Sequence, residues 1–450
     1  MNLHDIAQVL KQVDDRAAGF DQNLFIHQIV IDSRKLTKGD VFVALLGENF
    51  DGHDYIEAAV NRGAIAVICE KKPSHPVSVP CFVVPSSLQA LADIASYYRQ
   101  SIQCPIIAVT GSNGKTSVKE MIYSIFPKPS HATPGNLNNH IGVPLSLLAL
   151  TAEDRYAVFE LGANHPGEIA YTVAMVKPDV SLVNNVGPAH IAGFGSLEGV
   201  ARAKGEIYQG LGLGGTAVIN ADDAFADFWD NLLQDKKVLR FSLHKPADVT
   251  AKDIRFNADG CASFTLVLPK DQIQVALQVP GEHMILNALA AATCCYAVGV
   301  SAQDIACGLT AFSGVAGRMT FLTGKNKALI IDDTYNANLR SVLTAIDVLA
   351  KRQGQRILVL GDLGELGDFT QAHHEEIGRV AREKGIDLVL TCGAHSKFTT
   401  KAFGNNAKHF TNHKTLAEDL MPYLDENTTV LIKGSRSAVM ENVVHELLCV

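Results

Sequence analysis

The 450-residue chain is poor in charged residues, has one tryptophan and contains no apolar run long enough to span a membrane. Charged side chains make up 19% of the sequence, and the formal net charge is −8 at pH 7. Such a chain lacks the broad basic surface that binds nucleic acid or anionic membranes, so we expect neither as a partner. The N-terminal residues lack the basic and then apolar layout of a signal peptide, which favours a cytoplasmic protein.

The nine cysteines do not form a disulfide framework. Their number is odd, and the adjacent pair Cys294–Cys295 lies in an alanine-rich segment that predicts a helix. We therefore expect reduced, buried thiols, as in a protein of a reducing compartment. Collagen-like, disordered, disulfide-rich secreted and membrane proteins are thereby excluded as classes.

Length and pattern both predict three domains, all of the α/β class. Residues 1–100 mix short apolar strands with helices, which predicts a small α/β domain. Residues 101–314 alternate apolar strands with helical segments, which is typical of a mainly parallel sheet with helices on both faces. Within them, residues 249–279 alternate apolar and polar side chains, which predicts a small antiparallel excursion. After a predicted loop at 313–324, residues 315–450 form further strand–turn–helix units, which predicts a Rossmann-like domain.

The strongest local signal is the segment IIAVTGSNGKT at 106–116. An apolar strand leads into a glycine-rich turn, and a helix begins at Lys115 and Thr116. Such a turn directs backbone N–H groups at phosphate oxygens, the lysine adds charge, and the threonine hydroxyl can ligate Mg²⁺. Val109 stands where a complete P-loop has glycine, and a tight turn with an exposed lysine is the alternative. The strand before the turn and the helix after it favour a nucleoside triphosphate site, in a kinase, a switch GTPase, a motor or a ligase.

Further polar residues follow predicted strands or lie on predicted helices. Glu160 ends the strand YAVFEL, where a second magnesium ligand is expected. His190 follows the next strand, a position that alone is more often structural. Asp332–Asp333 ends another strand, where acidic residues bind ribose hydroxyls or metal. Three more candidates have an ordinary interpretation as solvent-facing or helical side chains: Lys204, Asn287 and Arg318.

In their order along the chain, these segments resemble the Mur ligases, the ATP-dependent amide-forming enzymes of bacterial peptidoglycan synthesis. The similar segments cover essentially the whole chain: TGSNGKTS (110–117), ELGANHPGEI (160–169), NNVGPAHIAGFGS (184–196), ARAKGEIY (201–208), PGEHMILNALAA (280–291), AGRM (316–319), DDTYNAN (332–338) and GDLGELG (361–367). ELGANHPGEI, DDTYNAN and IKGSRSAVME (432–441) are most similar to the members that add D-alanyl-D-alanine. The Asp-Asn-Pro-Arg motif of the diaminopimelate-adding members is absent from the sequence. Leu339 stands where the family usually has proline, and we expect this change to loosen a turn without removing a functional side chain.

The resemblance implies a role for each candidate. ATP would be held by Gly111, Ser112, Asn113, Gly114, Lys115 and Thr116, with Asn287 at the adenine, Arg318 at the γ-phosphate and Asp333 at the ribose. Magnesium would be bound by Thr116, Glu160, His190 and Lys204, the lysine as a carbamate, because an ammonium group would repel the cation. The catalytic residues would be Lys115, His190, Lys204 and Arg318. The UDP-sugar would be received by Ser33 and Arg34, within DSRKLTKGDVFVAL (32–45).

The implied activity is a monomeric ligase that adds D-alanyl-D-alanine to UDP-N-acetylmuramoyl-tripeptide through an acyl phosphate. The alternatives are a diaminopimelate- or lysine-adding ligase, a folylpolyglutamate synthase, a slowly hydrolysing P-loop regulator and an inactive scaffold. The intact GKT sequence, Glu160 and Lys204 argue against the scaffold. Arg318 follows a predicted domain junction, so we expect closure of the cleft to deliver it to the phosphate. The sequence singles out no general base for the incoming amine among His53, His140, His283 and His373.

Overall fold

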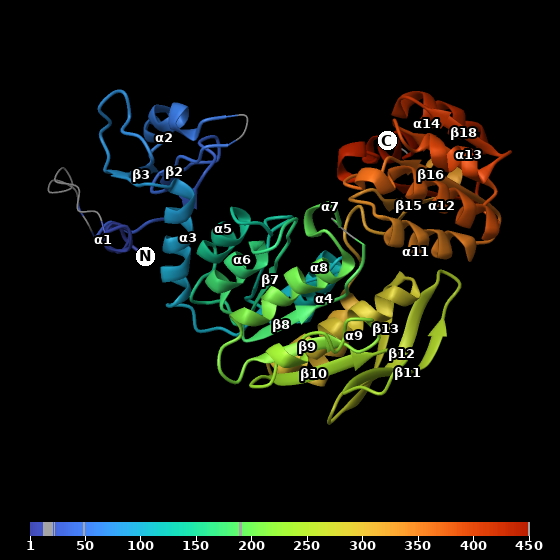
Figure 1. Ribbon diagram of the computed structural model, residues 1–450, viewed down its shortest axis with the longest axis horizontal. Helices are drawn as coiled ribbons and strands as arrows, with labels where there is room; N and C mark the ends of the chain where they lie inside the picture. The colour runs from blue at the N-terminus through green and yellow to red at the C-terminus, as the bar shows by residue number, and fades with distance from the viewer. Residues whose placement is uncertain (12–20, 22, 48–49, 189–190, 449–450) are drawn as a thin grey trace. The chain divides into compact units, whose positions relative to one another are not determined.

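The structure, a computed structural model, comprises two compact units. Figure 1 labels its helices and strands along the chain. It describes residues 1–11, 21, 23–47, 50–188 and 191–448. The first unit comprises residues 1–108, 127–162 and 167–179, and the second comprises residues 109–126, 163–166 and 180–450. The chain passes from the first unit into the second within strand β5 (Ile106–Thr110), a fully buried strand.

The first unit contains a four-stranded parallel sheet in the order β1-β2-β3-β4. The strands are β1 (Ile29–Val30), β2 (Val41–Val43), β3 (Ala66–Cys69) and β4 (Cys81–Val83). Val41 and Val43 share one core with α1 (Leu3–Val9) and α3 (Ser87–Arg99), whereas Phe42 shares the other with α2 (Ile56–Asn61). This alternation explains why helices cover both faces. The same unit holds β6 (His131–Ala132), β7 (Ala157–Glu160), α5 (Gly142–Leu148) and α6 (Glu168–Val176).

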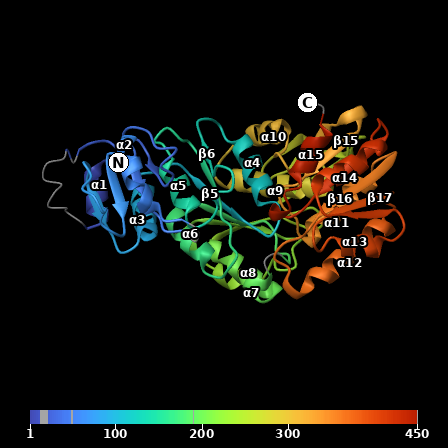
Figure 2. The same ribbon diagram turned by 90° about the horizontal axis from the view of Figure 1, so that it is seen from above.

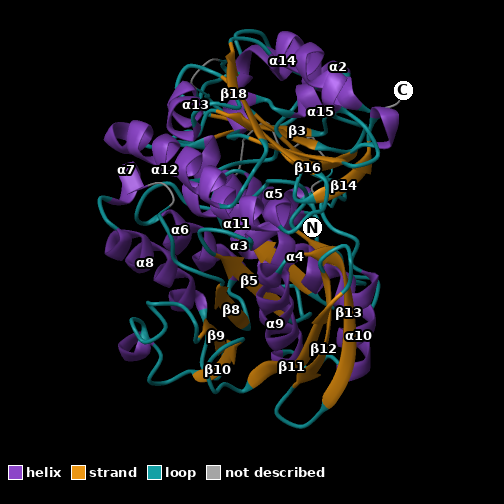
Figure 3. Ribbon diagram, turned by 90° about the vertical axis from the view of Figure 1, so that its right-hand side faces the viewer, coloured by secondary structure: helices purple, strands orange, loops and turns teal. Residues whose placement is uncertain are grey.

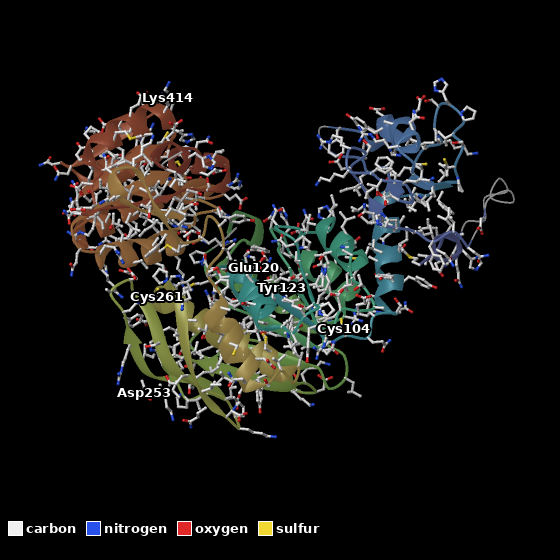
Figure 4. The ribbon with its side chains drawn as sticks, turned by 180° about the vertical axis from the view of Figure 1, so that it is seen from behind. Cys104, Glu120, Tyr123, Asp253, Cys261 and Lys414 are labelled. Carbon is white, nitrogen blue, oxygen red and sulfur yellow. The ribbon has the colours of Figure 1, made fainter. Side chains whose placement is uncertain are left out.

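The second unit begins with a mainly parallel sheet. β8 (Val180–Val183), β9 (Thr216–Asn220), β10 (Lys237–Ser242) and β11 (Val249–Phe256) are parallel neighbours. β12 (Cys261–Val267) and β13 (Gln272–Pro280) continue antiparallel, so the antiparallel excursion predicted at 249–279 is confirmed. Figure 4 labels Asp253, which has φ of 54° at a β-bulge of β11. Figure 2 shows α4 (Lys115–Ile125), α9 (Glu282–Ala297) and α10 (Ala302–Ala311) beside one another.

The C-terminal part of this unit is a six-stranded sheet in the order β14-β15-β19-β16-β17-β18. Its strands are β14 (Thr320–Thr323), β15 (Leu329–Asp333), β16 (Gln355–Gly361), β17 (Leu388–Cys392), β18 (Ala407–Phe410) and β19 (Thr428–Lys433). Ile331 faces a core with α11 (Leu339–Ala350) and α12 (Thr370–Glu383), and Ile330 faces one with α14 (His413–Leu420) and α15 (Glu441–Leu447). Figure 3 shows these helix pairs on opposite sides of the strands. The Rossmann-like prediction is thus confirmed.

One local prediction was wrong. Residues 313–324, predicted as a loop, contain β14, which pairs antiparallel with β15 from Thr320 to Thr323. The strand has only four residues, too few for a clear alternating pattern, and its pairing partner decides its conformation.

The predicted fold class is confirmed, whereas the domain boundaries 1–100, 101–314 and 315–450 stay a prediction. Within the described residues, no helix is long and apolar enough to cross a membrane. Every cysteine of that part of the chain is a free thiol, and Cys294 and Cys295 are buried as predicted.

Candidate active site

The phosphate loop, residues 111–114, connects the end of β5 to the start of α4. Gly111 has φ of 156° and Gly114 has φ of 78°, in the region that favours glycine. A Cβ atom at Gly114 would lie 2.6 Å from Nδ2 of Asn184 and 2.7 Å from Oδ1 of Asn287. Only glycine fits at this position, so the loop and the predicted adenine contact Asn287 are directly packed together.

A network of side chains holds the phosphate loop in shape. The hydroxyl of Ser112 donates to the Gly187 carbonyl (3.0 Å) and accepts the N–H of Gly187 (2.9 Å). Asn185 accepts the N–H of Asn113 (2.9 Å) and donates to its carbonyl (3.0 Å). Asn184 donates to the same carbonyl (3.0 Å). These two asparagines, which sequence reasoning did not assign, leave the loop pre-organised for a ligand.

A cavity of about 760 Å³ lies in the second unit, between the phosphate loop and the C-terminal sheet. It brings together residues that the sequence predicted as nucleotide contacts: Ser112, Asn113, Gly114, Lys115, Asn287, Arg318 and Asp333. Its size and mixed polar lining are typical of a small-molecule site. Its C-terminal wall is formed beyond the carboxyl ends of β15, β19 and β16, where open α/β sheets bind ligands.

Arg318 reaches from the C-terminal part to the phosphate loop. Its Nη2 donates to Oγ1 of Thr116 (2.9 Å), and its guanidinium lies 4.2 Å from the ring centroid of Tyr335. Its Nε is buried with no hydrogen-bond partner among the described residues. The ordinary interpretation of Arg318 as a surface charge is therefore wrong, because the side chain is positioned at the predicted magnesium ligand.

Asp333, the predicted ribose contact, ends β15 opposite Lys433 at the end of β19. The two side chains form a buried ion pair with an Oδ2–Nζ distance of 2.5 Å, and Nζ also donates to the carbonyl of Asn336 (2.9 Å). Burial raises the pKa of Asp333, and the ammonium of Lys433 opposes that shift. Lys433 was not assigned from the sequence, although its place at a strand end resembles that of Asp333.

Lys204 on α8 (Leu197–Gly205) is only 2% exposed. Its interpretation as a solvated lysine is wrong. Burial lowers the pKa of this amine well below the usual 10.5, and the charge of Lys115 lowers it further. A lysine in this environment carries its proton less readily, so its amine is available as a nucleophile.

Glu160 ends β7 in the first unit and is 2% exposed. Oε1 accepts from Nδ2 of Asn138 (2.8 Å), whereas the buried Oε2 has no hydrogen-bond partner among the described residues. A buried carboxylate oxygen left in this state fits a hard cation ligand. The other predicted metal ligand, His190, lies outside the described residues. Within the described part of the chain, no three His, Cys, Asp or Glu side chains gather into a metal site.

Comparison with known proteins identifies the family. Three family profiles match in order: "Mur ligase family, catalytic domain" at 25–99, "Mur ligase middle domain" at 109–295 and "Mur ligase, glutamate ligase domain" at 317–436. A curated Escherichia coli K12 protein named UDP-N-acetylmuramoyl-tripeptide–D-alanyl-D-alanine ligase is 42% identical over 449 residues, which cover 98% of both chains. The chain belongs to the Mur ligase family.

A further curated relative of this Mur ligase carries the same name, and two similar solved structures are named MurF. The Haemophilus influenzae protein is 41% identical over 95% of this chain and 94% of its own. The crystal structure of MurF from Acinetobacter baumannii aligns with a TM-score of 0.90 at 34% identity, covering 99% of this chain and 98% of that one. MurF from Thermotoga maritima in complex with ADP aligns with a TM-score of 0.83 at 30% identity, covering 95% and 98%.

The predicted UDP-sugar residues of this Mur ligase follow β1 in the first unit. Ser33 is buried, whereas the side chain of Arg34 is 84% exposed. Two nitrogens of Arg34 donate to the carboxylate of Asp32, at 2.9 Å each. The remaining N–H groups of Arg34 are open to solvent. The role of Ser33 and Arg34 in binding the UDP-sugar stays a prediction.

The four candidate histidines differ in their surroundings. His283 and His373 line the cavity, and burial lowers the pKa of both, that of His283 to about 4. An imidazole with so low a pKa is a weak base at neutral pH. His53 accepts the N–H of Glu70 (2.8 Å) through Nε2 and contacts Asp51 (2.5 Å) through Nδ1, so neither ring nitrogen is available for an amine. His140 is exposed in the first unit.

Leucine at position 339, where the family usually has proline, does not loosen the turn before α11. Leu339 is the first residue of α11, where proline is favoured but not required. Asn338 caps the helix by accepting the N–H of Ser341 (2.9 Å), and Ser341 accepts the N–H of Asn338 (3.0 Å). This reciprocal capping box defines the start of the helix without proline.

Proposed function

We propose that this Mur ligase joins D-alanyl-D-alanine to UDP-N-acetylmuramoyl-tripeptide, consuming ATP and releasing ADP and phosphate, in cytoplasmic synthesis of a peptidoglycan precursor. The observation that carries the ligase chemistry is the cavity in which Arg318 contacts Thr116 of the phosphate-binding segment. The choice of substrates is supported by full-length relatives that bear this activity in their names.

A carboxylate is a poor electrophile at neutral pH, so amide formation requires an activated acyl group. In the proposed reaction, the terminal carboxylate of the tripeptide attacks the γ-phosphorus of ATP, and the bond to ADP breaks. The amine of the dipeptide then attacks the acyl phosphate, loses a proton and expels phosphate. Both steps gather negative charge on phosphoryl oxygens, which Lys115 and Arg318, two cations of the cavity lining, would offset.

Magnesium is proposed to be bound by Thr116, Glu160, His190 and Lys204, as the resemblance to the family implies. Thr116 offers a hydroxyl, Glu160 a buried carboxylate oxygen without a hydrogen bond, and Lys204 an amine whose pKa is lowered. Carbamylation would convert Lys204 into an oxygen ligand, and His190 is proposed as a further ligand. A bound magnesium ion supplies charge compensation for the phosphates.

The three predicted domains divide the substrates. Residues 1–100, with Ser33 and Arg34, would take the UDP-sugar, and residues 101–314 would take ATP. Residues 315–450 would take the dipeptide and part of the nucleotide, including the ribose at Asp333. The enzyme is proposed to act as a monomer.

Phosphate release tests the proposal. The purified chain is incubated with ATP, Mg²⁺ and UDP-muramoyl-tripeptide, with D-alanyl-D-alanine, diaminopimelate, lysine or glutamate as the amine. We expect rapid release with the dipeptide only. Release with a single amino acid, or ATP hydrolysis that is indifferent to the UDP-sugar, would favour a diaminopimelate- or lysine-adding ligase, a folylpolyglutamate synthase or a P-loop regulator instead.

A further inference from the structure

The C-terminal wall of the cavity carries more positive charge than the assigned residues account for. Its cationic side chains are Arg318, Arg340, Lys433 and Arg436. Lys433 is paired with Asp333 and Arg436 with Glu441. No carboxylate within the described ranges forms an ion pair with Arg318 or Arg340. Two guanidinium groups without an ion-pair partner among the described residues therefore face one cavity, and only Arg318 has a role so far.

Arg340 lies beside the phosphate loop. It is the second residue of α11, and its Nη1 donates to the carbonyl of Val186 at 3.4 Å. A Cβ atom at Gly187 would lie 3.5 Å from Nη1 of Arg340 and 3.6 Å from Cβ of Ser112. Gly187 therefore lies next to both the guanidinium of Arg340 and Ser112, which places Arg340 beside the first half of the loop. Arg318 contacts Thr116, just beyond the other end of the loop.

The first turn of α11 is fixed against the same loop. Nδ2 of Asn338 donates to Oδ1 of Asn113 (2.8 Å), while Oδ1 of Asn338 caps the helix. The backbone that carries Arg340 is therefore held within reach of the loop. The hydrogen bond to Val186 is long and uses one of the five N–H groups of the guanidinium, so donors remain for an incoming oxyanion.

We propose that Arg340 is a second arginine of the active site, which contacts the γ-phosphate of the nucleotide on the Ser112 side of the loop. An arginine suits this task because its planar fork binds two phosphoryl oxygens at once. The proposal rests on the proposed function only in taking the nucleotide to be a triphosphate. Arg340 would then stabilise the phosphoryl group together with Lys115 and Arg318 during transfer.

Direct binding tests the proposal. Titration calorimetry with the full chain and Mg²⁺ compares ADP with β,γ-methylene-ATP, which carries a γ-phosphate that is not hydrolysed. We expect Arg340→Gln to weaken binding of the triphosphate analogue about tenfold, as for loss of a charge-assisted hydrogen bond. Binding of ADP should stay within about twofold of the wild type, because ADP lacks the group contacted.

Arg352, two residues beyond the C-terminal end of α11, provides a matched control. Its Nη1 donates to the carbonyl of Ala258 at 3.5 Å and lies 3.8 Å from Asp259, and its side chain does not line the cavity. Arg352→Gln removes a similar long contact to a backbone carbonyl, so we expect unchanged affinity for both nucleotides. A thermal unfolding scan verifies that both variants are folded.

The proposal would be overturned by unchanged affinity of Arg340→Gln for the analogue, by equal loss of affinity for ADP and the analogue, or by the same loss in Arg352→Gln. Weaker binding of UDP-muramoyl-tripeptide alone would also overturn it, because the anion contacted would then belong to that substrate and not to the nucleoside triphosphate. None of these measurements needs the dipeptide. Failure of the proposed ligase activity would therefore be recognised separately, in the phosphate-release assay.

Discussion

Lys204 shows how burial changes the chemistry of a common side chain. Its depressed pKa provides the unprotonated amine that carbamylation requires. We predict that Lys204→Ala lowers ligase turnover at least about 100-fold, the scale of losing a group that supports a metal site. Short carboxylic acids such as formate or acetate should restore part of the activity, because they replace the missing carboxylate-like oxygens.

The control for this experiment is the wild-type enzyme with the same acids, which should show no gain. Full activity of Lys204→Ala, or loss of activity without any rescue in a folded variant, would contradict the carbamate. Nucleotide binding by calorimetry separates a damaged site from an unfolded one.

Arg318 is predicted to act on the transferred group more than on the bound nucleotide. We expect Arg318→Ala to reduce kcat about 1000-fold, as for an arginine that stabilises phosphoryl transfer. The affinity for ADP should change less than about threefold, because ADP carries no γ-phosphate for Arg318 to contact. Steady-state kinetics and ADP titration measure the two effects. Equal loss of both would count against this role.

Individual site residues could be predicted only where residues adjacent in the sequence form a recognisable motif. The phosphate loop stands out because glycine, lysine and threonine follow one another directly. Asn184, Asn185 and Lys433 act through contacts between segments far apart in the sequence, such as the 3.0 Å bond from Asn184 to Asn113. Burial of Lys204 is likewise a property of packing, and the sequence alone indicated a solvated lysine.

Among the secondary-structure elements, α11 is predicted to be both a stabilising and a functional helix. Asn338→Ala removes its N-cap and its contact with Asn113, and should cost about 1 kcal/mol of unfolding free energy. Asn412 caps α14 in the same way, by accepting the N–H of Thr415 (2.9 Å). Asn412→Ala should therefore lose similar stability while keeping full turnover, whereas Asn338→Ala should also lose turnover. Equal activity in the two variants would contradict the role of the Asn113 contact.

Helix α12 contributes a pH dependence to stability. His374 is buried, accepts the N–H of Leu363 (3.3 Å) and contacts Thr399 (3.0 Å), and burial lowers its pKa to about 4. In the unfolded chain its pKa is about 6.5. The unfolded state therefore binds more protons in this range, and stability falls as the pH drops from about 6.5 towards 4.

Denaturant unfolding across this range checks the prediction. His374→Gln should show a shallower fall of unfolding free energy between about pH 6.5 and 4, although His283 leaves part of the slope. If the unfolding free energy of His374→Gln differs from that of the wild type by the same amount at every pH, His374 does not titrate as described.

The helices of these units could be predicted from apolar residues at a helical period, and the buried strands from continuous apolar runs. Ile330 and Ile331, for example, are both apolar since helices cover both faces of their sheet. The short strand β14 could not be predicted, because its pairing with β15 decides it. The capping box that starts α11 was also missed, although Asn338 and Ser341 have the required spacing. It defines the helix start without a proline at position 339.

At the scale of the whole molecule, the net charge of −8 and the anionic substrates are compatible because the positive charge is local. One cavity is lined by Lys115, Arg318 and Arg340. The negative net charge is a property of the whole chain and does not exclude a local positive potential in this cavity. The cavity is lined by several segments that lie far apart in the sequence, between residues 112 and 437. Composition therefore could not predict its lining.

The central claim is that the chain adds a dipeptide to a UDP-linked tripeptide. It is tested most directly by mass spectrometry of the product formed from ATP, Mg²⁺ and UDP-muramoyl-tripeptide with equal amounts of D-alanyl-D-alanine, D-alanine, lysine, diaminopimelate and glutamate. We expect one new UDP-linked species, heavier than the tripeptide substrate by the mass of the dipeptide less one water. A product that carries a single amino acid, or none despite ATP hydrolysis, would contradict it.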